Sequence, residues 1–285
     1  MKKLFAILLA GLMIVSFAAC KDEDGDANDL DAYRQEEIII DNYTNDKGQT
    51  FYFDSLDSET ITITGYKGGD VPHAVEIPST MHDKTVAGIS DQAFYSLSNI
   101  TEIKIPNTVT FIGSMAFAEC RQLTAITIPA GVEEIGEAAF MRCNSLKSIT
   151  FEAGSKLTAL PLAAFKECKS LESVTVPANI KSIGKAAFQD CHALKTIVIE
   201  EGVESLGVQA FQNCKALESL TLPATLKTIE GFDEAENLFA SFNFTGCDAL
   251  YIEGVKLPAD ANSVAAKYIA KLNLQNKPAE ETPAA

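Results

Sequence analysis

Residues 123–143 read LTAITIPAGVEEIGEAAFMRC, and their apolar pattern determines the architecture of the chain. Ile126 and Ile128 alternate with small or polar residues, which predicts a short strand that buries one face. Pro129 follows, and because proline has no backbone N–H to donate, the strand should end there. The stretch therefore begins with a short strand and an abrupt corner.

The second half of the stretch carries further apolar positions. Val132 and Ile135 form a shorter apolar pair, and Ala139, Phe140 and Cys143 fit one face of a turn or short helix. About eight apolar side chains in this stretch would then point inward. One such unit cannot bury them alone, whereas stacked units can.

The pattern recurs along the chain, which is the mark of a repeat architecture. Successive Phe residues of the repeat are separated by 23, 25, 23, 23 and 33 positions, and each is followed three positions later by Cys. An earlier unit has Leu97 where the others have Cys. The pairs are Phe117/Cys120, Phe140/Cys143, Phe165/Cys168, Phe188/Cys191, Phe211/Cys214 and Phe244/Cys247, with Phe94/Leu97 before them.

The recurring motif is Leu-x-x-Ile-x-Ile-Pro, then Val-x-x-Ile-Gly-x-x-Ala-Phe-x-x-Cys. It resembles the BspA-type leucine-rich repeats of bacterial surface proteins, over roughly residues 51–258. The resemblance implies a leucine-rich repeat solenoid, β-rich with short helical turns. We expect a right-handed, curved stack of parallel sheets with an N-terminal β-hairpin cap and a C-terminal helical cap.

The N-terminus has the features of an export signal. Residues 1–19 contain two lysines and then a short apolar stretch, and small residues precede Cys20, as in a bacterial lipobox. We expect cleavage before Cys20 and lipidation of its thiol; the alternative is an ordinary secretory signal with an incidental cysteine. The Lys-Asp-Glu run that follows resembles the export signal of Bacteroidetes surface lipoproteins. Residues 20–37 should form an acidic tether, because their like charges repel one another and stay solvated. A calcium loop is the alternative interpretation of the aspartates, but the position of Gly25 and the flanking residues do not fit it.

The rest of the chain divides around the repeats. Residues 38–74 should form the N-terminal β cap, and residues 75–258 about seven repeat units with an insertion at 231–240. Residues 259–276 should form a C-terminal cap, with helical spacing in part, and residues 277–285 a disordered tail. The units also vary: Glu152 and Glu200-Glu201 stand where other units have the strand-ending proline.

The formal net charge of −16 limits the function classes. Nucleic-acid binding needs clustered Lys and Arg, so we expect no nucleic acid, and contact with a membrane only through the lipid. The chain has neither a phosphate loop nor a Gly-x-Ser-x-Gly elbow, and its three histidines are scattered. We therefore expect no cofactor, no bound metal, no catalytic residues and no enzymatic activity, and a monomer.

The repeat register predicts which side chains share the solvent face of the sheet. Stacking places equivalent positions about 4.8 Å apart. One column then consists of small polar residues, with a lysine near its start, and is a candidate partner-binding surface. Its candidate residues are Lys104, Thr127, Thr150, Thr175 and Thr221.

The insertion is a second candidate. Phe232, Phe239 and Phe242 lie among acidic residues there, and exposed aromatic rings beside polar groups are typical of interface anchors. The alternative is that these rings fold back and cover the end of the stack.

The repeat cysteines invite metal or disulfide interpretations. Their spacing lacks the close pairs of a zinc site, and the equivalent Leu97 indicates an inward apolar position. Stacked neighbours could in principle approach disulfide distance. We expect buried free thiols.

The function implied by the resemblance is a surface-exposed outer-membrane lipoprotein that recognises proteins or matrix components, as an adhesin does. A fold does not fix a function, so two alternatives stay open. The first is a glycan-binding accessory lipoprotein, which would need an aromatic platform that we expect only from the insertion. The second is a surface hydrolase.

Overall fold

The structure is a computed structural model, and it describes residues 41–69, 73–233, 238–239, 243–250, 254–256 and 263–271. For residues 233, 238 and 239 it describes the backbone alone. The predicted signal peptide, Cys20, the acidic tether, Phe242 and the predicted tail lie outside the described residues.

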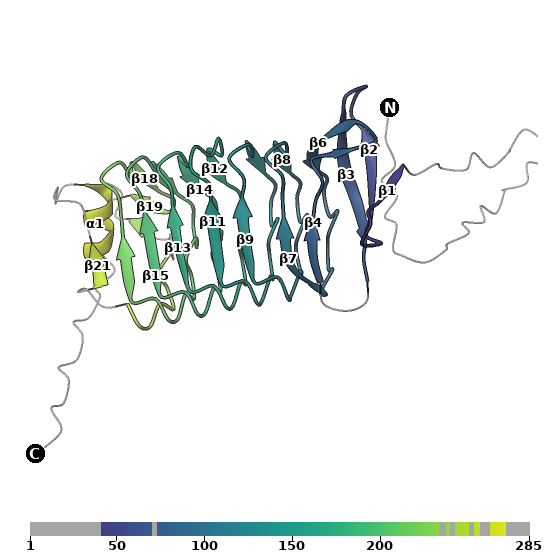
Figure 1. The fold of residues 1–285 in the computed structure, drawn as a ribbon. Coiled ribbons are helices and arrows are strands. Elements are labelled where there is room, and N and C mark those ends of the chain that lie inside the picture. Colours follow the sequence, from purple (N-terminus) through teal and green to yellow (C-terminus); the bar gives the residue numbers. More distant parts are fainter. Residues whose placement is uncertain are drawn as a thin grey trace, which may run out of the picture. The chain divides into compact units, whose positions relative to one another are not determined.

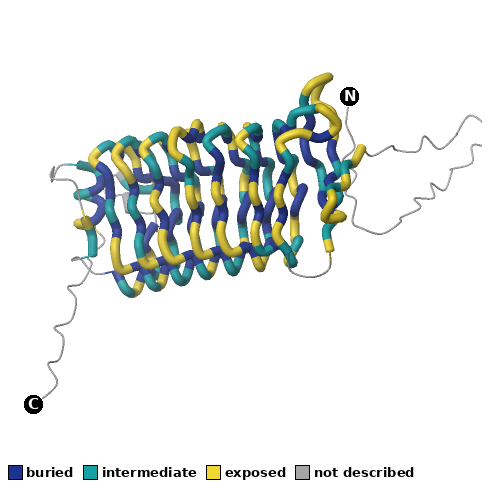
Figure 2. Tube along the Cα trace, viewed as in Figure 1, coloured by how far each residue is buried: buried dark blue, intermediate teal, exposed yellow. Residues whose placement is uncertain are grey.

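The described chain is a parallel β-solenoid of about seven turns, which confirms the predicted fold class. Figure 1 shows the strands stacked along one axis, with β1, β2 and β3 at one end and α1 at the other. Strand residues alternate between buried and exposed, so one face of each strand points into a continuous core (Figure 2).

The N-terminal cap is an antiparallel meander. It comprises β1 (Asn42–Thr44), β2 (Thr50–Ser55) and β3 (Thr60–Lys67), each paired with the next. The meander buries Phe51 and Phe53 of β2 and Ile63 of β3. The hairpin β5 (Thr80–Met81) and β6 (Lys84–Ile89) follows, and β6 joins β3 in parallel, so the meander continues directly into the solenoid.

The first long side of the solenoid carries the strands that the Ile-x-Ile pattern predicts. Their pairing is parallel throughout, as β4–β7, β9–β11 and β13–β15–β17–β21. The strands are β4 (His73–Glu76), β7 (Ile100–Lys104), β9 (Ala125–Ile128), β11 (Ser148–Phe151), β13 (Ser173–Val176), β15 (Thr196–Ile199), β17 (Ser219–Thr221) and β21 (Val255–Lys256).

The second side carries two-residue strands from the Val-x-x-Ile positions. They pair in parallel, β8 and β10 in continuation of the longer β6, and β12–β14–β16–β18 as a separate ladder. The strands are β8 (Phe111–Ile112), β10 (Glu134–Ile135), β12 (Ala159–Leu160), β14 (Ser182–Ile183), β16 (Ser205–Leu206) and β18 (Thr228–Ile229).

Among the described strands, the ladder of the first side is interrupted between β7 and β9 and again between β11 and β13, and that of the second side between β10 and β12. The last two interruptions fall at the unit that is two residues longer than its neighbours. Its first strand, β11, pairs only with the preceding unit, and its second strand, β12, pairs only with the following one. Glu152 replaces proline here, and its carboxylate accepts a hydrogen bond from the N–H of Ala130 at 3.0 Å. The carboxylate of Glu200 likewise accepts a hydrogen bond from the N–H of Ala178 at 3.1 Å. Each glutamate therefore satisfies the N–H group that follows the proline of the preceding unit.

The third side is built from turns. Ala138 and Arg142 have φ values of 54° and 61°, and equivalent residues repeat this in the other units. The N–H groups of Ala138, Phe140 and Arg142 consequently donate to carbonyl groups of the next unit, at 2.9, 2.9 and 2.8 Å. This side is thus held by a ladder of backbone hydrogen bonds without regular strands.

The core is a column of stacked aromatic rings. Neighbouring Phe rings from Phe94 to Phe244 have centroids 5.1 to 5.7 Å apart, within the range for favourable ring pairs. Tyr66 of β3 continues the column at one end, 5.3 Å from Phe94. Tyr268, from helix α1 (Val264–Lys271), lies 6.1 Å from Phe244 at the other. A tyrosine from each cap therefore closes the column.

Candidate binding surfaces

The predicted column of polar residues lies on the solvent face of the first side. Thr127 pairs with Thr150, and Thr175 pairs with Val198. Thr127, Thr150 and Thr175 are exposed, and Thr221 is half-buried between Val198 and the exposed Lys256 of β21 in the same column. The surface is flat and offers small hydroxyl-bearing side chains without a charged clamp.

Lys104 lies at the start of this face, beside Glu76 on the neighbouring strand. Its Nζ atom is 2.7 Å from a carboxylate oxygen of Glu76. This hydrogen bond and the attraction between the charges lower the pKa of Glu76 and raise the pKa of Lys104. Both side chains are exposed, so the pair orients the two groups more than it stabilises the fold.

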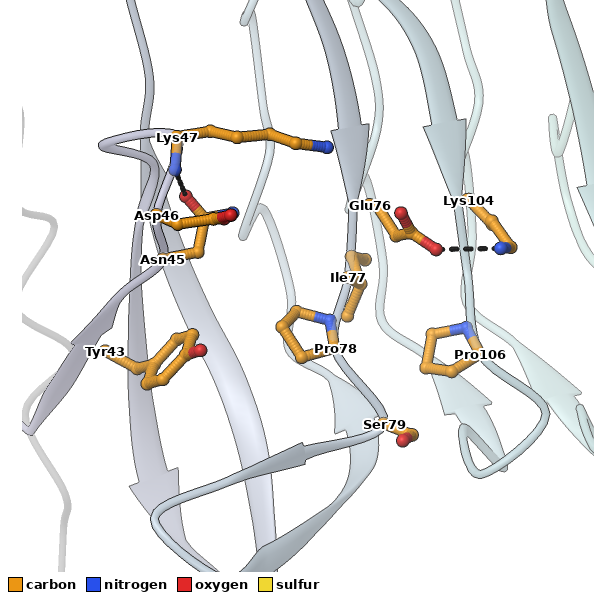
Figure 3. Close-up of a pocket in the computed structure, with 10 residues that line it drawn as sticks. All are labelled: Tyr43, Asn45, Asp46, Lys47, Glu76, Ile77, Pro78, Ser79, Lys104 and Pro106. Atoms are coloured by element: carbon orange, nitrogen blue, oxygen red, sulfur yellow. Dashed lines mark hydrogen bonds and ion pairs between the residues drawn. The ribbon is translucent and has the colours of Figure 1, made fainter.

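A pocket of about 420 Å³ opens beside Lys104. It lies between the turn that joins β1 to β2 and the ends of β4 and β7 (Figure 3). Of the residues that line it, only Lys104 is a candidate from the sequence. The lining residues are Tyr43, Asn45, Asp46, Lys47, Glu76, Ile77, Pro78, Ser79, Lys104 and Pro106.

Side-chain amides fix one wall of this pocket. Asn45 accepts hydrogen bonds from the N–H groups of Lys47 and Gln49, both at 3.0 Å, which sets the turn. Gln49 is buried and donates to the carbonyl of Ala74 on β4 at 2.8 Å. The cap is therefore tied to the edge of the first solenoid strand.

Sequence reasoning missed the cap side of the pocket. The signal was present, because Asn45-Asp46-Lys47-Gly48 is a turn sequence between two apolar segments, and Gly48 has a φ of 72°. The expectation that only the insertion supplies an aromatic platform was also incomplete, since the half-buried Tyr43 lines this pocket.

The insertion forms a small antiparallel hairpin. Strands β19 (Phe232–Asp233) and β20 (Leu238–Phe239) pair, with Phe232 opposite Phe239. The Phe232 ring is half-buried and meets Tyr268 of α1 edge-on, with centroids 5.3 Å apart. Phe232 thus packs toward the C-terminal end of the core, while the side chain of Phe239 and all of Phe242 lie outside the described part of the chain.

The six repeat cysteines are buried free thiols. Burial raises the pKa of Cys120 to about 12, and it raises the pKa values of Cys143 and Cys168 as well. Within the described residues, no group of three or more His, Cys, Asp or Glu side chains is arranged to hold a metal ion. In the same residues, no helix is long and apolar enough to cross a membrane.

Comparison with solved structures places the fold among bacterial leucine-rich repeat proteins. A T. pallidum leucine-rich repeat protein is 29% identical with a TM-score of 0.64, over 80% of this chain and 95% of that one. A leucine-rich cell surface protein of Faecalibacterium prausnitzii is 29% identical with a TM-score of 0.60, over 77% and 55%. A leucine-rich repeat protein of Eubacterium ventriosum shares the fold at 23% identity and a TM-score of 0.59, over 72% and 50%. The chain thus spans about half the length of the last two proteins.

Sequence comparison agrees with the structural one. A search of curated proteins found no significant match. A family profile described as the BspA type leucine rich repeat region matches residues 74–192 and 158–276, in six copies. These two matches together extend over most of the chain and include the solenoid strands from β7 to β21. The chain belongs to the BspA-type leucine-rich repeat family.

Proposed function

We propose that this protein is a lipid-anchored recognition scaffold on the cell surface that binds proteins or matrix components and catalyses no reaction. The observation that carries the proposal is the outward face of the first side, where the exposed Thr127, Thr150 and Thr175 form a flat polar surface. Backbone hydrogen bonds between paired strands hold this surface in place. Little conformational entropy of the backbone would therefore be lost when a partner binds.

Three further features support the proposal. Small hydroxyl-bearing side chains lose little conformational entropy when they become buried in an interface. The 29% identical F. prausnitzii protein is described as a cell surface protein, and Cys20 follows a sequence resembling a lipobox. A lipid at Cys20 and a surface-facing repeat domain would present the solenoid outward from an outer membrane.

The β19–β20 hairpin is the second element that we propose to contact a partner. Phe239 pairs through its backbone with Phe232, at the C-terminal end of the stack. The hairpin and the polar column would provide an aromatic anchor and a broad polar surface, the combination that protein interfaces use.

The experiment is a binding screen with the purified protein. We expect saturable binding to at least one member of a panel of immobilised matrix proteins, measured by biolayer interferometry. An unrelated solenoid of similar negative charge serves as the control for nonspecific adsorption. Failure to bind any matrix protein, or hydrolysis of one of them, would contradict the proposal.

A further inference from the structure

The pocket beside Lys104 contains two charged side chains that make no hydrogen bond to another side chain of the described residues. Within the described residues, the carboxylate of Asp46 and the Nζ atom of Lys47 take part in no ion pair and no side-chain hydrogen bond. The hydroxyl group of Ser79 lies on the opposite wall (Figure 3). The pocket therefore offers both hydrogen-bond donors and acceptors to a ligand.

The backbone of β4 adds a donor and an acceptor on the same side. The N–H of Ile77 donates to the carbonyl of Lys104 at 3.0 Å, so the peptide groups of Ile77 face β7. Alternate residues of a strand direct their N–H and C=O groups to opposite sides, and those of Glu76 consequently face the cap. Among the described strands β4 pairs with β7 alone, so the N–H and C=O groups of Glu76 remain available to a ligand in the pocket.

Apolar surface accompanies these polar groups. Figure 3 shows the Tyr43 ring reaching from the cap toward Pro78, with Pro106 on the next solenoid turn. An aromatic wall with a few polar groups beside it is the composition expected of a small-ligand site, and 420 Å³ is within the usual range of about 300–1,000 Å³.

The charges in the pocket balance. Lys47 and Lys104 are offset by Asp46 and Glu76, so the site favours neither an anion nor a cation. A neutral ligand with many hydroxyl groups suits such a site, because each hydroxyl both donates and accepts, and its C–H faces can pack on the Tyr43 ring.

An extended peptide fits this edge less well. The carbonyl of Ala74 already accepts a hydrogen bond from the side-chain amide of Gln49, and Pro78 has no backbone N–H to donate. A peptide added to β4 would gain hydrogen bonds at Glu76 alone, whereas strand addition draws its affinity from a row of such bonds.

We propose that this pocket binds a terminal sugar residue of a neutral oligosaccharide. Tyr43 packs on the sugar ring, and Asp46, Lys47 and the backbone of Glu76 hydrogen-bond its hydroxyl groups. This ligand class goes beyond the proposed recognition of proteins. The pocket adjoins the column of Thr127, Thr150 and Thr175 (the threonine column) at Lys104 and shares no threonine with it.

The test is an array of neutral, sialylated and sulfated oligosaccharides probed with the purified protein. We expect binding to neutral members, and titration calorimetry with the best of them should show at least tenfold weaker affinity for Tyr43→Ala and for Asp46→Ala. The matched controls are Tyr95→Ala, at a residue that is 39% exposed elsewhere on the solenoid, and Asp54→Ala on β2.

The controls should bind as the unchanged protein does, and circular dichroism should show that all four variants fold. Because Asp46 is exposed, its variant keeps the test valid even if Tyr43→Ala unfolds the cap. The proposal is overturned if no neutral sugar binds, if only acidic sugars bind, or if Tyr43→Ala and Asp46→Ala both keep full affinity. Binding of matrix proteins should be unchanged in these variants, which separates this site from the proposed function.

Discussion

The thiol of Cys143 donates a hydrogen bond to the carbonyl oxygen of Phe117, one repeat earlier, at 3.2 Å. The other repeat cysteines make the equivalent bond at 3.2 to 3.4 Å. The inward position therefore requires a small side chain that can also satisfy a buried carbonyl group. In the first unit no repeat precedes, and Leu97 occupies the position.

Removing one of these thiols should destabilise the solenoid. Cys168→Ala loses buried surface and its hydrogen bond to the carbonyl of Phe140. We expect the free energy of unfolding to fall by about 1–3 kcal/mol in urea denaturation. Lys169→Ala, at the exposed neighbouring residue, should change it by less than about 0.5 kcal/mol. Equal effects for the two variants would contradict this role of the thiol.

The thiols should also make stability depend on alkaline pH. Burial raises the pKa of Cys120 from 9.0 to about 12, so the folded state holds its proton after the unfolded chain has lost it. The stabilisation is complete below pH 9.0 and is lost as pH rises toward 12. Urea unfolding at several pH values should show this decline in the free energy of unfolding.

The buried thiols should also be unreactive in the folded protein, so their alkylation, measured by intact mass, should require denaturant. Disulfide-linked repeat peptides in the folded protein would refute the prediction.

The membrane anchor depends on a single residue. Cys20→Ser removes the thiol that would carry the lipid, so the protein should leave the detergent phase or keep its signal segment. Phase partitioning with intact-mass analysis measures both. A variant that is processed normally and still partitions into detergent would remove the lipoprotein hypothesis.

Excision of residues 231–240 tests the hairpin. A solenoid tolerates loss of an insertion because each unit contacts only its neighbours. We expect a melting temperature within a few degrees of the unchanged protein, together with loss of partner capture. If the excision instead unfolds the last repeats, the contact of Phe232 with Tyr268 belongs to a structural cap, and the hairpin is not a binding element.

The repeat made much of the fold predictable. A fixed separation of 23 residues places Thr127 beside Thr150 and stacks Phe117 on Phe140, because each unit adds one turn of similar length. The same spacing predicts the inward cysteines. It does not give their acceptor, which depends on where the carbonyl of the preceding unit points.

The pocket could not be predicted in this way. Tyr43 and Pro78 come from segments that do not repeat, and they meet only because Gln49 ties the cap to β4 through the carbonyl of Ala74. The interruption at β11 and β12 falls in the unit with the separation of 25 residues. The repeat pattern does not specify the backbone positions at this unit, so it could not tell which strands would lose a pairing partner.

The most direct test of the recognition surface is the affinity of a Thr150→Arg, Thr175→Arg double variant for a matrix protein that the screen identifies. Two arginines on this flat face should obstruct contact sterically and weaken binding at least tenfold. Thr158→Arg places the same exposed side chain just before β12, on the second side, and should leave the affinity unchanged. Unchanged affinity of the double variant, or an equal loss in Thr158→Arg, would contradict the assignment of binding to the threonine column.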